Sequence, residues 1–228
     1  MDTHLRTVRA AGRAGVVGGV LTAAGGIGVQ LFVLPQTSVS SEMWTYPWSG
    51  RAYVVVTLLY GALHLLVLGS FWGFSVSGLA GNGRATRVGY VLALGGTALL
   101  AIAEVMSLFW VGQRTDAAGP SVTAGVFGLG TVMTAIGFLV LGVTTLRAHA
   151  WTGWQRFTPL ALGVWTTVLL VLIVSPISAL AIGIYGLLIA GLGLAMITAP
   201  EPAAGAAYSR GHVPQHPPAV QLRAAGDD

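Results

Sequence analysis

The sequence predicts an all-α membrane protein, a bundle of six transmembrane helices with both termini in the cytoplasm. Hydrophobic residues make up 54% of the 228 residues and charged residues only 8%, whereas a soluble domain carries about a quarter charged residues. Six apolar stretches each approach the ~20 residues that a helix needs to cross a hydrocarbon core of ~30 Å. Strand-like alternation of polar and apolar residues is absent, which argues against a barrel.

The first apolar stretch, residues 14–34, follows a basic N-terminal segment, residues 1–13, which we assign to the cytoplasm. The stretch is longer than the roughly 7–15 apolar residues of a signal peptide, and residues 35–38 offer no small-x-small cleavage site. We therefore expect it to be retained as the first span.

Five further stretches complete a transmembrane domain that covers residues 14–197. The backbone of each must be hydrogen-bonded within lipid, so each is expected to be helical. The fifth is the shortest, and a tight turn at Ser175 and Pro176 joins it to the sixth, where Pro176 suits the first helical turn. The five stretches are residues 52–72, 88–111, 122–145, 158–174 and 177–197.

The basic residues, all of them arginine, set the orientation. With six spans and the N-terminus inside, nine of the eleven fall on the cytoplasmic side, which is the positive-inside pattern. Only Arg51 and Arg114 fall outside, together with Glu42 and Asp116. Removing any one span destroys this segregation. The predicted cytoplasmic arginines are Arg6, Arg9, Arg13, Arg84, Arg87, Arg147, Arg156, Arg210 and Arg223.

Aromatic residues mark the predicted membrane boundaries, because rings with a polar edge favour the headgroup level. One cluster lies in the first outer loop and another in the inner loop before the fifth span. The two clusters are Trp44, Tyr46 and Trp48, and Trp151, Trp154 and Phe157.

The last segment, residues 198–228, is rich in proline and has no apolar periodicity, so we predict a disordered cytoplasmic tail. His212 and His216 have the spacing of a helical metal site, but Pro214 lies between them and disfavours a helix. We therefore expect no metal site there.

Small residues at helical spacing predict close helix packing. In the first span Gly15, Gly19 and Ala23 are four residues apart, and similar pairs occur in the fourth and sixth spans. Small-xxx-small patterns let helix backbones approach where lipid supplies no hydrophobic drive. Packing inside a single bundle is one interpretation, and a dimer face on the first span is the other.

Glu104 is the most unusual polar residue of the sequence, because it is the only acidic residue inside a predicted span. An intramembrane carboxylate is costly and suggests a proton or cation site by default. Gln30 and Thr57 lie at a similar or slightly shallower predicted depth. A structural hydrogen bond, or snorkelling toward Arg51 or Arg114, is the alternative for Glu104.

His64 is the only histidine inside a predicted span, in the inner half of the second stretch. A count of residues from the span ends places it at a different depth from Glu104. We therefore expect no direct pair without helix tilt or water. A lone intramembrane histidine is most often an interhelical hydrogen bonder.

Several chemistries are excluded by composition. The chain has no cysteine and no lysine, so Cys-ligated metals and a Schiff-base retinal are ruled out. One intramembrane histidine cannot give a bis-His haem, and no nucleophile–base or metal motif is visible. We expect no cofactor, no metal, no catalytic residue and no enzymatic activity. Because topology explains the arginines, no nucleic-acid partner is expected.

Three segments in the second half of the chain stand out: 142–147 (GVTTLR), 151–156 (WTGWQR) and 162–165 (LGVW). Together with the lysine-free, Ala/Gly/Arg-rich composition, they make about this half resemble the broad set of uncharacterised multi-pass membrane proteins of high-GC actinobacteria. The resemblance implies a cell-membrane location and no particular activity.

Two classes of function stay open. The first is an accessory or interaction protein of the cell membrane, whose partners are the lipid bilayer and either a second copy or another membrane protein. The scarcity of polar residues and the short loops favour it. The second is a small-solute or proton-coupled transporter that uses Glu104. The sequence names no ligand for it.

Overall fold

The computed structural model of the protein describes residues 3–199. Six helices in this part of the chain are long and apolar enough to cross a membrane, which confirms the predicted all-helical, multi-pass architecture. The only β-type pairing within the same residues is one bridge between Met43 and Arg114. The helices are α1 Thr3–Gly28, α2 Gly50–Val76, α3 Arg84–Ser107, α4 Ala118–Ala148, α5 Thr158–Leu172 and α6 Ser178–Ile197.

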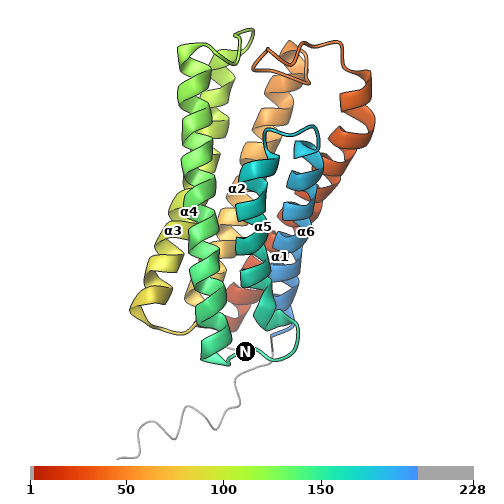
Figure 1. Ribbon diagram of the computed structural model, residues 1–228. Helices are drawn as coiled ribbons and strands as arrows, with labels where there is room; N and C mark the ends of the chain where they lie inside the picture. Colours follow the sequence, from red (N-terminus) through yellow and green to blue (C-terminus); the bar gives the residue numbers. More distant parts are fainter. Residues whose placement is uncertain (1–2, 200–228) are drawn as a thin grey trace, which may run out of the picture.

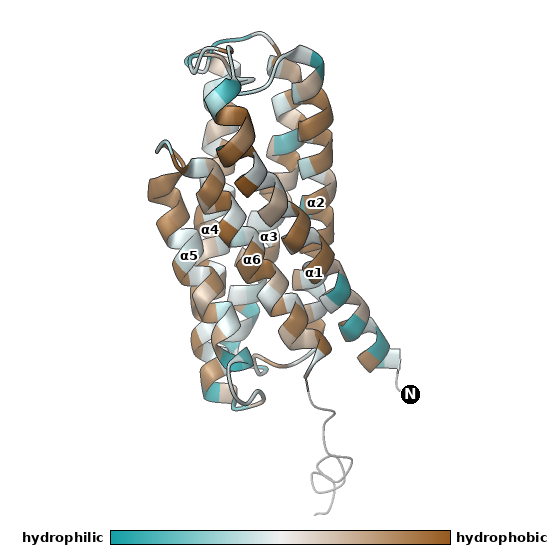
Figure 2. Ribbon diagram, turned by 90° about the vertical axis from the view of Figure 1, so that its right-hand side faces the viewer, coloured by the Kyte–Doolittle hydropathy of each residue, from teal (hydrophilic) through white to brown (hydrophobic). Residues whose placement is uncertain are grey.

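The six helices form a closed ring, in which each packs on its chain neighbours and α1 packs on α6 (Figure 1). Apolar residues dominate along the helices, and hydrophilic residues gather toward the two ends (Figure 2). The end formed by the loops 37–49 and 111–117 is called the cap end here. The opposite end, which holds the loops 77–83 and 149–154, is called the arginine end.

The first helix is longer than the predicted first span. α1 begins at Thr3, within the segment 1–13 that the sequence assigns to a separate N-terminus. Val8 and Ala11 are buried in this extension, because it packs on the rest of the bundle rather than leaving it. At its other end α1 continues through one π-helical turn, Val29–Val33. The proline-rich segment and both of its histidines lie outside the described residues.

Aromatic side chains fill the space between the six helices in the half of the bundle nearer the arginine end. The rings of Phe71 and Phe138 meet edge to face with centroids 4.5 Å apart, and Phe74 stacks on Trp151 at 5.6 Å. All four side chains are buried. Trp151, which the sequence predicts as a boundary marker, thus has its ring in the space between helices, while Trp154 and Phe157 remain exposed.

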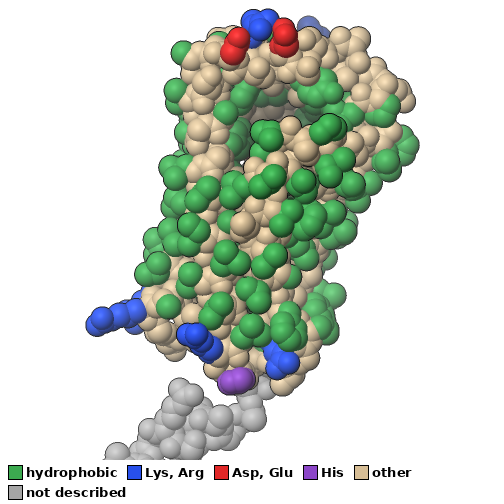
Figure 3. Space-filling view, viewed as in Figure 1, with side chains coloured by type: hydrophobic (Ala, Val, Ile, Leu, Met, Phe, Trp, Pro, Cys, Tyr) green, Lys and Arg blue, Asp and Glu red, His purple; other side chains and the backbone are tan. Residues whose placement is uncertain are grey.

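In the other half of the bundle the space between the helices is less filled, because α5 is short. Its 15 residues span only about 22 Å, against 31 residues in α4. The turn between α5 and α6 therefore stops well before the cap end (Figure 1). The space-filling view shows a hollow above this turn and beneath the acidic and basic side chains of the cap end (Figure 3).

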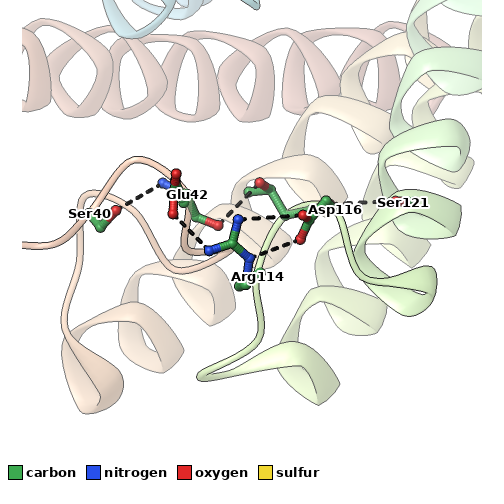
Figure 4. A network of polar contacts seen from close by, with 6 residues as sticks. Ser40, Glu42, Arg114, Asp116 and Ser121 are labelled. Carbon is green, nitrogen blue, oxygen red and sulfur yellow. Dashed lines mark hydrogen bonds and ion pairs between the residues drawn. The ribbon is translucent and has the colours of Figure 1, made fainter.

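The two loops of the cap end are tied together over this hollow. The amide of Trp44 donates to the carbonyl oxygen of Gln113 at 2.9 Å. The Arg114 guanidinium lies between two carboxylates, 2.8 Å from Glu42 and 3.2 Å from Asp116 (Figure 4). Its hydrogen bonds and positive charge hold the pKa of Asp116 below its usual range. All three side chains are exposed, so the ties hold the loops together at the surface.

Candidate functional site

A cavity of about 550 Å³ occupies the half of the bundle nearer the cap end. Its wall is mostly apolar, and residues from all six helices contribute to it. A second hollow of about 320 Å³ lies against the first and is lined partly by the cap loop. The two spaces meet at five residues that line both: Trp44, Tyr60, Glu104, Phe127 and Ile182.

Small residues help to create the cavity. Gly128 and Ala124 of α4 line it, and a Cβ added to Gly128 would meet nothing within 4 Å. The sequence groups these two residues with the helix-packing pairs, but here the missing side chain leaves room instead of contact. Val67 and Ile189 line the cavity on the side of the aromatic packing.

Glu104 and His64 meet in the wall of this cavity. The His64 Nδ1 and Glu104 Oε1 atoms are 3.7 Å apart, and the side chains are 18% and 15% exposed. The expectation that the two residues lie too far apart in depth for a direct pair is therefore wrong. Within residues 3–199 the Glu104 carboxyl has no closer polar partner, so it faces the cavity with its hydrogen-bonding capacity largely unused.

The direction of the side chains explains why the depth count failed. Glu104 is level with Gly61, because a Cβ on Gly61 would lie 3.8 Å from the Glu104 Cβ. His64 is therefore about one turn nearer the arginine end. A helical side chain leans toward the N-terminus of its own helix. Since α2 and α3 are antiparallel, His64 leans toward the cap end and Glu104 toward the arginine end, and the two converge.

The backbone fixes the tautomer of His64. Its Nδ1 atom lies 2.9 Å from the carbonyl oxygen of Tyr60, and a carbonyl only accepts hydrogen bonds. Nδ1 therefore carries the proton and donates it. When the ring is neutral, Nε2 is left as an acceptor. The His64 atom nearest to Glu104, at 3.7 Å, is thus this N–H, whose hydrogen bond goes to Tyr60, and the neutral ring brings no charge to the site.

Of the other two predicted polar residues, Thr57 lies at the site and Gln30 holds two helices together. Thr57 is buried on α2 and lines the smaller hollow together with Glu104. Gln30 lies in the π-helical turn, and its side chain is hydrogen-bonded to the start of α6. The side-chain Nε2 of Gln30 donates to the carbonyl oxygen of Pro176 at 3.1 Å, and its Oε1 accepts from the backbone N–H of Leu180 at 3.3 Å. Gln30 therefore fixes the start of α6 to α1.

The predicted glycine face of the first span lies inside the bundle. Gly15, Gly19 and Ala23 are buried where α1 crosses α6. A Cβ on Gly19 would collide with the backbone of Gly186 and Ala190. Of the two interpretations, packing within one chain is the one this structure contains, and the face is not accessible to a second copy.

The aromatic side chains of the site were not singled out by sequence. Tyr60 was available as a signal, since Thr57, Tyr60 and His64 follow a helical spacing on one face of α2. Trp44 was interpreted as a boundary marker, but it lines both hollows. Its indole N–H is buried with no hydrogen-bond partner among the described residues. Phe127 gave no signal beyond its apolar character.

Searches with protein-family models, among curated proteins and among solved structures find no match for this chain. The resemblance to actinobacterial membrane proteins therefore stays a prediction.

Proposed function

We propose that this protein is a small-solute transporter that holds its solute in the cavity beside Glu104. The observation that supports this is the meeting of a partly buried carboxyl and an imidazole in the wall of a space of about 550 Å³. Ligand sites are mostly apolar spaces of roughly 300–1,000 Å³ with a few convergent polar groups. An ionisable group within a membrane span is costly, so its position at such a cavity favours a functional role.

We place the protein in the cell membrane with the arginine end in the cytoplasm. Arg84, Arg87, Arg147 and Arg156 lie at that end, and short cytoplasmic loops carry an excess of arginine. In this orientation the cavity lies in the outer half of the membrane. Solute would then enter from outside, and both termini would be cytoplasmic.

The geometry favours transport over the accessory role for two reasons. The glycine face that suggested a dimer is occupied by α6. The scarce polar residues are not scattered, because Glu104, His64 and Thr57 surround connected spaces.

Native mass spectrometry of protein extracted gently with its lipids tests the proposal. We expect a reproducible non-lipid small molecule that is lost in Glu104→Gln. Glu42→Gln is the matched control, because it makes the same change at an exposed carboxyl of the cap end. Uptake of that molecule into proteoliposomes would then distinguish a carrier from a receptor.

A bare protein, or a solute retained equally by both variants, would count against the proposal. A copurifying membrane protein in place of a solute would instead support the accessory role.

A further inference from the structure

We infer that the solute is an organic cation, an ammonium group carried on an apolar body. This rests on the proposed function and names the chemical class that the same cavity would select. Three properties of the lining point to it: the sign of the available charge, the aromatic residues, and the apolar surface beyond.

The acidic and basic side chains of the lining favour a positively charged solute. Glu104 is the only acidic side chain lining either hollow, and no arginine lines them within residues 3–199. His64 commits its Nδ1–H to the Tyr60 carbonyl and brings no charge when neutral. Beside a neutral His64, a carboxylate in this mostly apolar wall has no cationic partner, which is costly. A ligand that brings positive charge and N–H donors removes this cost, whereas an anion would add to it.

Aromatic residues share the lining of both hollows with the carboxyl. Trp44, Tyr60 and Phe127 line both spaces together with Glu104. The face of an aromatic ring attracts a cation within about 6 Å, most strongly when both are shielded from water. Rings together with one carboxylate favour a partly apolar ammonium over a strongly hydrated metal ion. In addition, no three His, Asp or Glu side chains come together in the described part of the chain.

The remaining wall sets the character of the rest of the solute. Leu169 and Leu170 of α5, and Ile173 just after it, give the cavity an aliphatic side together with Ile182 and Ile189 of α6. That side reaches the short α5–α6 turn, where Val174 is 89% exposed. Figure 3 shows a hollow above this turn. An apolar body could lie along the aliphatic side while the ammonium reaches Glu104.

Three probes of similar size separate the sign of the charge from the apolar contribution: 4-phenylbutylammonium, 4-phenylbutanol and 4-phenylbutyrate. Each is titrated calorimetrically into purified protein in nanodiscs, with empty nanodiscs subtracting membrane partition. We expect saturable binding of the ammonium, about tenfold or more tighter than the alcohol, because a charge-assisted hydrogen bond is lost in the neutral probe. The carboxylate should bind least.

Variants test which residue is responsible. Glu104→Gln should remove the preference for the ammonium, Glu104→Asp should retain part of it, and Glu42→Gln should leave it unchanged. Gly128→Leu places a side chain in the cavity and should weaken the ammonium and the alcohol together. Size-exclusion profiles and melting curves confirm that each variant is folded.

The results separate this inference from the function on which it rests. Equal binding of ammonium and alcohol, or tighter binding of the carboxylate, overturns the cationic class while leaving a solute site in place. If no probe binds but a copurifying solute still depends on Glu104, the inference falls and the proposed function stands. If neither is found, both fall.

Discussion

Gly19 of α1 and Gly186 of α6 lie so close that a Cβ on Gly186 would be 2.6 Å from the Gly19 carbonyl oxygen. The two helices cross with backbone against backbone, which only residues without a side chain allow. This crossing closes the ring, because α1 and α6 are its first and last members.

Replacing Gly186 by alanine should therefore destabilise the protein. The added methyl group meets the Ala23 amide nitrogen at 2.5 Å, so the helices must separate. Overpacking of this kind costs about 1–3 kcal/mol. Gly128→Ala is the matched control, because its methyl group would enter open space. Thermal unfolding in detergent should show a lower Tm for Gly186→Ala only, and equal shifts would contradict the close crossing.

Gln30→Leu should weaken the attachment of α6. The Leu180 amide is among the first helical N–H groups, which lack an intrahelical partner, and Gln30 supplies one from α1. Its loss, together with the bond to the Pro176 carbonyl, should cost about 1–3 kcal/mol. Gln36→Leu makes the same change at an exposed position. The two variants are compared by thermal unfolding, and an unchanged Tm for Gln30→Leu would refute this role.

The contact between Arg114 and Asp116 should make the cap end sensitive to acid. Because Arg114 lowers the pKa of Asp116, the folded protein favours the carboxylate. The contact therefore stabilises the cap above the ordinary aspartate pKa of about 4 and is lost as the pH falls through the lowered value.

Hydrogen exchange in residues 111–117, followed by mass spectrometry, measures this effect. Asp116→Asn should exchange faster than the wild type at neutral pH, and the two should converge in strong acid. Comparing both proteins at each pH cancels the intrinsic pH dependence of exchange. A difference that persists in strong acid would contradict the assignment to this carboxylate.

The orientation predicts the outcome of reporter fusions. A reporter fused after Asp228 should be active in the cytoplasm, and one inserted at Ala117 in the cap end should be active outside. Both positions follow from an even number of spans with the arginine end inside. The opposite pattern would invert the topology, and a mixed pattern would refute six spans.

The sequence predicted the architecture well because lipid imposes a simple rule. Apolar length and arginine placement gave the six spans, and the structure places a helix at each. The start of α1 at Thr3 was missed because a helix can continue beyond the apolar stretch when residues such as Val8 find a contact. Hydropathy does not record such contacts.

The site was only partly predictable for a geometric reason. Glu104 and His64 were identified as unusual by residue type, but their meeting depends on the register of α2 against α3 and on the lean of each side chain. Neither is a property of one helix alone. Likewise, Trp44 and Trp151 look like boundary markers in the sequence, and only tertiary packing reveals that one lines a cavity and the other a core.

The aromatic packing of Phe71, Phe74, Phe138 and Trp151 has a consequence for the energetics of the cell. Buried rings in direct contact leave little room for water between them. They lie between the cavity and the arginine end of the bundle. In the orientation proposed above, they would act as a barrier on the cytoplasmic side of a solute held in the outer half, and such a barrier helps a cell to keep its membrane potential.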